Sequence, residues 1–365
     1  MLKDGFRDDI DAIVEFLPKK PKRQTFLFGE KQTYALKQMA SRLLVSDHHV
    51  VNPTPNVQRT KHADIAQYNT ILPNASHQIP YLMKLIAHDQ MTHPAKSKVV
   101  IYLPTTRMTQ LFSNLVRQLR ATCFPAGDQT NVYEVHSLIP FLERPKAVDD
   151  LHQDKSGASV LLTTDLTSRN TKFYGITRVI QFGIPSSDPV YFNRLACVSR
   201  ASKKTGRCDS VLLPWEMGYL TWHLMDVPFT PLTVKELDTQ LLELSETVSS
   251  TKDVHPAVRT WVNSASSSIV ALIESAVKSF LPQLGEESIR GTFVSILGYY
   301  VMKSREIRAQ QSVIVQGVKD WATGACGLRR PPYVSDAFLT RLGDHGGRKK
   351  RPGHAHNTSR WTRPQ

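Results

Sequence analysis

The stretch from Lys98 to Pro214 decides the fold, because short apolar segments recur along it. These segments are VVIYL (99–103), SVLLT (159–163), TRVIQFG (177–183) and SVLL (210–213). Short runs of Val, Ile and Leu separated by helical segments are typical of strands buried on both faces of a parallel sheet. The sequence therefore predicts an α/β domain. Its strands are expected at residues 65–72, 98–103, 131–135, 158–163, 177–182 and 209–213.

Polar side chains directly follow two of the expected strands. Pro104-Thr105-Thr106-Arg107 follows the first quoted segment, and Thr164-Asp165 follows the second. Open α/β sheets bind their ligands at the carboxyl ends of the strands. We therefore expect a binding site at this edge, although Thr106, which precedes a helix, would also be a good N-cap.

The composition indicates a polyanionic partner. The 365 residues include 46 Lys and Arg against 32 Asp and Glu, which gives a net charge of +14. Such an excess favours nucleic acid, and the alternative is a merely soluble basic protein. The four cysteines show no C-x-x-C spacing, so neither a zinc site nor a disulfide framework is expected. No apolar run reaches the length of a membrane span.

The pattern changes four times along the chain. Five parts are expected, at residues 1–45, 46–62, 63–226, 227–343 and 344–365. The first part holds two helical patterns and one strand, Thr25–Phe28, which cannot close a domain alone. It either packs on the following domain or has lost its own. A polar linker, the α/β domain, a part made of helices only and a basic tail expected to be disordered follow in turn.

Four stretches together resemble motifs of one family. IYLPTT (101–106), TDLTSR (164–169) and NRLACVSR (193–200) are similar to the fourth, fifth and sixth motifs of DEAD-box RNA helicases. GFRDDI (5–10) looks like the helix that follows their acidic box. The chain thus resembles the fungal mitochondrial group of this family, which carries a helical C-terminal extension.

The resemblance implies a fold and an activity. The expected fold is a RecA-like parallel sheet of the P-loop NTPase superfamily followed by an all-α extension. Residues 1–45 would be a remnant of the first RecA-like domain, and 63–226 would be the second. The family unwinds or remodels RNA and uses ATP and Mg²⁺ as cofactors.

The chain departs from the family at the residues that handle ATP. It contains neither a G-x-x-x-x-G-K-[ST] loop nor an acidic box. The fifth motif ends in Lys172 where the family has a carboxylate, and Cys197 replaces one of two arginine fingers. Arg194 and Arg200 remain as candidate catalytic residues. An arginine finger can be worth ~10³–10⁵ in rate, so we expect no ATPase activity and no bound cofactor for this chain alone.

RNA binding is better preserved in the resemblance. The family's fourth and fifth motifs bind the sugar–phosphate backbone without reading sequence, and hydroxyl and guanidinium groups suit that task. The expected RNA-binding residues are Thr105, Thr106, Arg107, Thr164, Asp165, Arg169, Arg348, Lys349, Lys350 and Arg351. The same residues could instead only cap turns or be solvated. We expect RNA as the partner, bound mainly through its phosphates, and neither a membrane nor specific DNA.

Two other interpretations stay open. The chain could be a catalytically dead scaffold that keeps the fold without RNA binding, or a gene-model fragment of a full RNA helicase. The resemblance suggests the mitochondrion, but the first residues show no transit-peptide pattern. The location is therefore unknown beyond an expected intracellular one.

Overall fold

The computed structural model describes residues 7–19, 22–28, 34–51, 65–168, 171, 173–199, 206–250, 254–265 and 268–344. The chain divides into two compact units, Met1–Arg59 and Thr60–Gln365. The described part of the first unit contains helices α1 (Arg7–Glu15) and α2 (Tyr34–Leu43). An ion pair of 3.0 Å between Arg42 and Asp11 joins these two helices.

The strand predicted at Thr25–Phe28 is wrong. Residues 22–28 are described and form neither a helix nor a strand. A strand needs a neighbour to pair its backbone N–H and C=O groups, and the described part of the first unit offers none. Local β propensity alone therefore did not produce a strand here.

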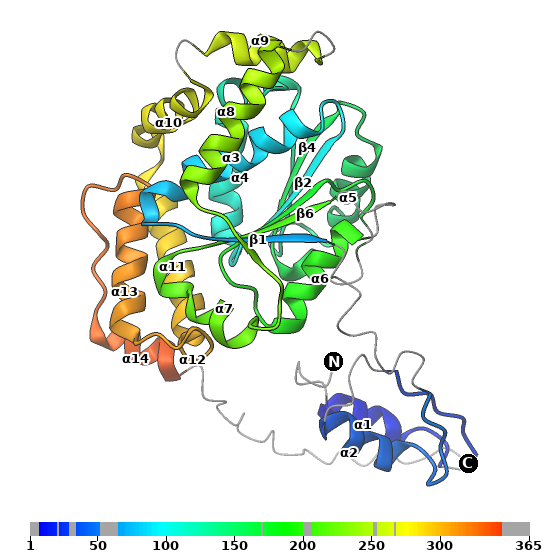
Figure 1. Cartoon of the computed structure of the whole chain (residues 1–365). Coiled ribbons are helices and arrows are strands. Elements are labelled where there is room, and N and C mark those ends of the chain that lie inside the picture. The colour runs from blue at the N-terminus through cyan, green and yellow to red at the C-terminus, as the bar shows by residue number, and fades with distance from the viewer. Residues whose placement is uncertain are drawn as a thin grey trace. The chain divides into compact units, whose positions relative to one another are not determined.

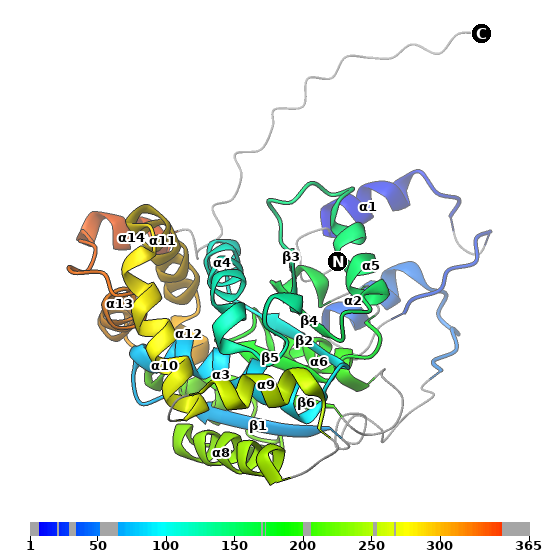
Figure 2. The ribbon, with the colours of Figure 1, turned by 90° about the horizontal axis from the view of Figure 1, so that it is seen from above.

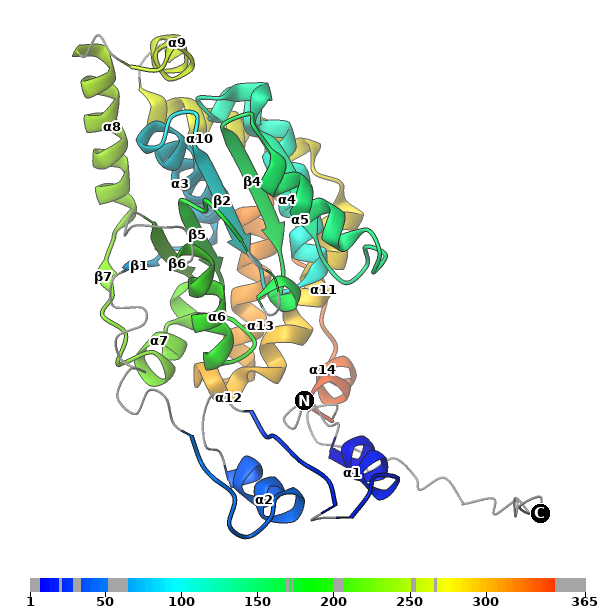
Figure 3. The same cartoon turned by 90° about the vertical axis from the view of Figure 1, so that its right-hand side faces the viewer.

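The second unit is built around one parallel sheet (Figure 3). Its seven strands lie in the order β3-β4-β2-β5-β6-β1-β7, and every pairing is parallel. The strands are β1 (Ala66–Ile71), β2 (Ser97–Tyr102), β3 (Asn131–Val135), β4 (Ala158–Thr163), β5 (Arg178–Phe182), β6 (Arg207–Leu212) and β7 (Thr230–Pro231). Every residue of β4 and β5 is buried, as their apolar runs predict. The predicted α/β fold class is confirmed.

The prediction of helices only from residue 227 onward is wrong at one point. Thr230–Pro231 forms β7 and pairs with Tyr68 and Asn69 of β1. Proline has no N–H to donate, so it is tolerated in a strand only at a sheet edge. A Thr-Pro pair does not predict a strand from the sequence. The pairing of these two residues with β1, at the outer side of the sheet, is known only from the structure.

Helices cover both faces of the sheet (Figure 2). The connecting helices are α3 (Gln78–Thr92), α4 (Thr106–Cys123), α5 (Arg144–Gln153), α6 (Asp188–Ser199) and α7 (Gly218–His223). Helices α3 and α4 lie on one face, and α5 and α6 lie on the other. The sequence pattern around α5 is loose because only Val148 and Leu151 of this helix are buried.

The helices after β7 pack on the α3–α4 side of the sheet (Figure 1). They are α8 (Val234–Ser250), α9 (Pro256–Ser264), α10 (Ile269–Phe280), α11 (Glu286–Met302), α12 (Ser304–Ile307), α13 (Gln311–Asp320) and α14 (Asp336–Asp344). Helices α10 and α11 contact α4, and α8 contacts α3. Reciprocal hydrogen bonds between Thr233 and Glu236 form the capping box that opens α8. Among the described residues, no helix has the length and apolarity to cross a membrane.

Candidate functional site

The ends of β2 and β4 bring the two predicted polar segments to one edge of the sheet. The strands pair in register, with Tyr102 opposite Thr163. The Leu103 N–H extends the ladder by donating to the Thr163 carbonyl over 2.9 Å. Because parallel strands end on the same side, Thr105 and Thr164 follow at the same edge. We call the loops that follow the carboxyl ends of β2, β3, β4 and β5 the carboxyl edge.

Three of the predicted residues lie at the start of α4. The Thr105 hydroxyl accepts a hydrogen bond from the Met108 N–H over 3.3 Å and is the N-cap of the helix. The Thr106 hydroxyl lies 3.1 Å from that of Ser137, which follows β3. Arg107 is exposed, and no described residue pairs with its guanidinium group. Among the described residues, the Thr106 hydroxyl and the exposed Arg107 guanidinium thus lie at the start of α4, beside Ser137.

Thr164 and Asp165 follow β4 in a different setting. The Thr164 hydroxyl accepts from the Leu166 N–H over 3.4 Å and caps a single 3-10 turn. The Asp165 carboxylate accepts from Arg194 Nε over 2.8 Å and from the Ser186 N–H over 3.0 Å. Burial alone would raise the pKa of Asp165, but Arg194 and these hydrogen bonds hold it below its usual value. The Asp165 carboxylate therefore binds Arg194 and Ser186 of the protein itself.

Arg194, a predicted catalytic residue, is buried and contacts other residues of the chain. Its side chain is fully buried, donates to Gln181 over 3.4 Å, and lies over the Tyr102 ring. Asp165 and Gln181 together accept from three of the five N–H donors of its guanidinium group. No group of three or more potential metal ligands occurs in the described part of the chain.

A rigid loop after β3 also lies at this edge. The Arg144 guanidinium donates to the carbonyls of Ile139 and Ser137, each over 2.8 Å. The Leu138 N–H donates to His136 Nδ1 over 3.2 Å, and His136 Nε2 lies 2.8 Å from the Glu134 carboxylate. Ser137 was missed from the sequence, although it also follows a strand end. The same rule that selected Thr105 would have selected it.

Helix α11 contacts the carboxyl edge through its last turns. Tyr299 donates to the Ile184 carbonyl over 2.9 Å, and Lys303 donates to the Ser186 carbonyl over 2.7 Å. The Tyr300 hydroxyl donates to the buried Glu216 carboxyl group, which follows β6. Burial raises the pKa of Glu216 to about 7, partly opposed by the Leu213 N–H and Tyr300. The sequence contained no sign of this junction.

Gly183 makes the junction at α11 possible. Its φ of +80° is a conformation that favours glycine. A Cβ atom at this position would lie 2.6 Å from the Tyr300 hydroxyl and 2.8 Å from Pro104 Cγ. The end of β5, the loop that precedes α4 and helix α11 therefore approach one another here.

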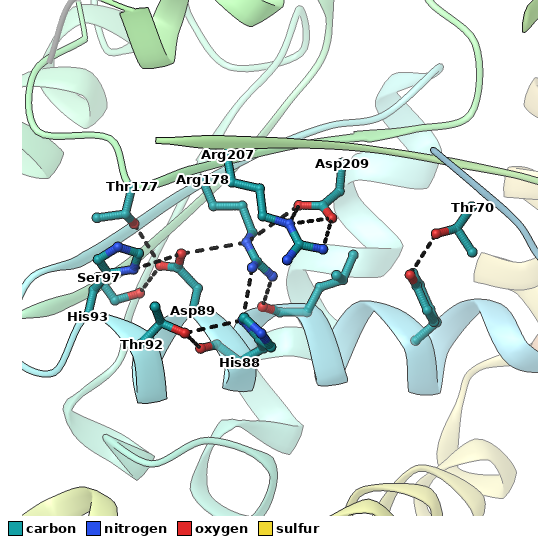
Figure 4. A network of polar contacts seen from close by, with 12 residues as sticks. Thr70, His88, Asp89, Thr92, His93, Ser97, Thr177, Arg178, Arg207 and Asp209 are labelled. Carbon is teal, nitrogen blue, oxygen red and sulfur yellow. Dashed lines mark hydrogen bonds and ion pairs between the residues drawn. The ribbon is translucent and has the colours of Figure 1, made fainter. Parts of the chain in front are cut away.

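The opposite edge of the sheet holds a buried polar network, which the sequence did not predict (Figure 4). We call it the amino-edge network, and it joins the end of α3 to the starts of β2, β5 and β6. Arg178 Nε lies 3.6 Å from Asp89 and 3.5 Å from Asp209. Asp209 also pairs with Arg207 over 2.6 Å. Asp89, Arg178 and Asp209 are all nearly inaccessible to solvent.

Further hydrogen bonds complete the amino-edge network. Asp89 accepts from the Ser97 and Thr177 hydroxyls over 2.7 and 2.6 Å. Burial alone would raise the pKa of Asp89, but His93, Arg178 and Thr177 bring it below its usual value. Burial and the neighbouring Arg178 lower the pKa of His88 to about 3, so this ring is neutral. The charges in this network are buried and lie against one another, although Arg178 Nε and Asp89 Oδ1 make ion pairs without a hydrogen bond.

Six predicted site residues lie outside the described residues. They are Arg169, Arg200, Arg348, Lys349, Lys350 and Arg351. Lys172, where the fifth motif departs from the family, also lies outside them. Their assigned roles stay predictions.

Comparison with known proteins finds relatives in plants. No protein-family model matches the chain. DEAD-box ATP-dependent RNA helicase 25 of Oryza sativa subsp. japonica is 29% identical over 94% of this chain and 49% of its own length. DEAD-box ATP-dependent RNA helicase 26 of Arabidopsis thaliana is 24% identical over 94% of this chain and 34% of its own. The chain spans half or less of the length of either relative.

Solved structures share the fold. The DEAD-box helicase Mss116 bound to single-stranded RNA and UDP-BeF matches 93% of this chain and 61% of its own, with a TM-score of 0.63 and 19% identity. Domain 2 of Mss116p bound to an RNA duplex matches 76% of this chain and 94% of its own, with a TM-score of 0.55 and 18% identity. The sheet and the helices that follow it therefore form a known arrangement.

Proposed function

We propose that this chain, a homologue of DEAD-box ATP-dependent RNA helicases, binds single-stranded RNA through its phosphate backbone and does not hydrolyse ATP by itself. The observation that carries the proposal is the grouping at the carboxyl edge. The hydroxyls of Thr106 and Ser137 lie 3.1 Å apart, and the guanidinium of Arg107 has no described partner; these residues follow β2 and β3, which both pair with β4. Such groups bind phosphate and sugar oxygens without reading bases.

The RNA-bound states of similar structures support this choice of ligand. Mss116 was solved with single-stranded RNA, and its domain 2 was solved with an RNA duplex. The net charge of +14 agrees with a polyanionic partner. The finer placement, in the fungal mitochondrial group with a helical extension, is part of the same proposal. It is supported by the helices that follow the sheet.

The proposal excludes ATP hydrolysis by this chain alone because of Arg194 and Cys197. Arg194 is occupied by Asp165 and Gln181, and Cys197 lies buried, 3.1 Å from the Tyr102 hydroxyl. Phosphoryl transfer in this family depends on placed cations around the phosphates. The described residues provide no free arginine of that kind at α6. Phosphate release above the level of a blank without protein would contradict this part.

A second candidate function is a scaffold without RNA binding. The exposed apolar side chains of Leu138, Phe141 and Leu142 favour it, since contiguous exposed apolar surface marks interaction sites. A gene-model fragment of a full helicase would show the same surface. An in-frame phosphate loop and acidic box in the genomic sequence upstream would establish that case.

Binding of single-stranded RNA across several salt concentrations separates RNA binder from scaffold. Each phosphate contact contributes about −0.7 to the slope of log K against log salt. We expect Arg107→Ala to weaken binding similarly for unrelated sequences and to make the slope shallower by roughly 0.7. Arg330→Ala is the matched control, since it removes an exposed arginine of the segment after the π-helical turn Trp321–Ala325.

The outcomes distinguish the two candidate functions. If the full-length protein binds no RNA even at low salt, the scaffold function is favoured over RNA binding. Equal losses for Arg107→Ala and Arg330→Ala would mean that net charge alone holds RNA, and that the carboxyl edge is not the site.

A further inference from the structure

An open groove lies beside the edge strand β3, outside the residues assigned to RNA. It runs between α4 and α5 and has a volume of about 690 Å³. Its polar lining comes from Gln110, Glu134, His136, Glu143, Lys146 and Asp150. We call it the β3 groove.

The β3 groove carries unpaired negative charge. Glu134 is paired with Arg117 and lies against His136. Glu143 and Asp150 are exposed, and no described cation forms an ion pair with either of them. The exposed Lys146 also lines the groove, so these two carboxylates make it weakly acidic in a chain with a net charge of +14. A nucleic acid would be repelled by them, so the groove fits a positively charged partner.

The loop after β3, which contributes Leu138, Ile139 and Pro140 to the groove lining, carries exposed apolar side chains. Leu138, Phe141 and Leu142 are 62%, 76% and 86% exposed. The loop that carries them is held by the two hydrogen bonds from Arg144 to its carbonyls. A rigid loop with exposed aromatic and aliphatic groups loses little conformational entropy when a partner binds. The partner should therefore present an apolar or aromatic side chain beside its positive charges.

We propose that the β3 groove binds the basic C-terminal segment of this same chain, residues 345–365. This segment contains six Lys and Arg, no acidic residue, and one aromatic residue, Trp361. Its cations complement Glu143 and Asp150, and Trp361 complements Phe141 and Leu138. Attachment to the same chain gives the segment a high effective concentration, so even weak contacts would hold it.

The length of the segment allows this docking. The 17 residues from His345 to Trp361 span roughly 55–60 Å when extended. A folded unit of about 300 residues has a radius of gyration of about 19 Å. Trp361 can therefore reach β3 from the end of α14. The proposal does not depend on RNA binding, because it concerns contacts within one chain and can be tested with no RNA present.

Zero-length carbodiimide cross-linking of the full chain, followed by peptide mass spectrometry, tests the docking. The reagent joins a lysine amine to a carboxylate in direct contact. We expect Lys349 and Lys350 to link to Glu143 or Asp150 several times more often than to Glu243 or Glu246. The latter two are also exposed carboxylates, on helix α8, and serve as the control. Raising the salt concentration should reduce the links to the groove.

Variants that keep every carboxylate and every lysine sharpen the test. Phe141→Ser and Trp361→Ser each remove an apolar contact and should lower the links to the groove by roughly two- to tenfold. Phe141 is mostly exposed, so its replacement should leave the fold intact. Val294→Ser on α11 is the matched control at another exposed apolar residue and should change nothing.

Three results would overturn the proposal. The first is an equal frequency of links from Lys349 and Lys350 to the groove and to α8, which would show only general attraction. The second is links found only between ¹⁴N- and ¹⁵N-labelled copies, which would make a second molecule the occupant. The third is no change in Phe141→Ser and Trp361→Ser.

Discussion

The two edges of the parallel sheet use charged and polar residues in opposite ways. At the amino edge, Asp89, Arg178 and Asp209 are buried and contact one another, with hydroxyl groups from Ser97 and Thr177 completing the network. At the carboxyl edge, the polar groups of Thr106, Ser137 and Arg107 lie at the surface.

This difference shows that residue type alone does not separate structure from function. Arg178 and Arg107 are both arginines close to a strand end, yet one is almost inaccessible and the other is unpaired among the described residues. Burial decides which of them can meet a ligand. Asp165 and Arg194 combine features of both cases. They lie at the carboxyl edge, as Arg107 does, but they bind each other, as the residues of the amino-edge network do.

The largest expected effect comes from breaking the amino-edge network. Arg178→Met removes the buried cation and leaves Asp89 without its guanidinium partner. We expect the free energy of unfolding to fall by about 3–5 kcal/mol, because an unpaired buried charge is strongly destabilising. Urea denaturation measures it. Arg207→Met, which removes a partly accessible arginine from the same network, is the matched control and should cost less. A loss below about 1 kcal/mol would show that the network is not a structural element.

The second effect concerns pH at the junction between β6 and α11. The pKa of Glu216 is raised to about 7 in the folded protein, against 4.5 normally. The folded state therefore binds this proton more tightly, and the stability from Glu216 is complete below about pH 4.5 and lost as pH rises through 7. Glu216→Gln should raise the free energy of unfolding at pH 8 by about 1–3 kcal/mol and change it little at pH 4.5.

Denaturation of both proteins at the two pH values measures this effect. Glu243→Gln, which replaces an exposed carboxylate on helix α8, is the matched control. An equal change for Glu216→Gln at both pH values would mean that Glu216 does not titrate in this range.

The smallest effect separates capping from binding at the carboxyl edge. Thr105→Ala removes the N-cap of α4 and should lower the free energy of unfolding by about 1 kcal/mol. Thr105→Ser keeps the capping oxygen and should restore it. Arg107→Ala should stay within about 0.5 kcal/mol of wild type, because its side chain is exposed, yet it should weaken RNA binding. Thermal denaturation and RNA binding are measured on the same samples. Equal losses of stability for Thr105→Ala and Arg107→Ala would make both residues structural.

The sheet was largely predictable because its strands are buried on both faces. The expected strands at 131–135 and 158–163 agree with β3 and β4 at both ends. A run of hydrophobic residues indicates a buried strand from the sequence alone. Strand β7 has no such run, and it forms because Thr230 and Pro231 pair with β1 in the folded sheet. The strand expected at 25–28 failed for the converse reason, since it had no described neighbour.

The candidate site was predictable only in part. Residues that follow strand ends, such as Thr105 and Thr164, were located correctly at one edge because parallel topology places strand ends together. The roles assigned to them stay predictions. The pairing of Asp165 with Arg194 joins residues 29 positions apart, and neither residue signals the other in the sequence. The same holds for Glu216 and Tyr300, which lie 84 positions apart.

The contact around Gly183 has a consequence for modularity. The end of β5, Pro104 and Tyr300 approach so closely that one added methyl group would force them apart. Tyr300 also supplies the hydroxyl that meets the buried Glu216 carboxyl group. Removing α11 would therefore expose an ionisable group that the sheet cannot satisfy alone. The sheet and the helices through α11 should therefore unfold as one cooperative unit. We expect them to be inherited and exchanged together as well.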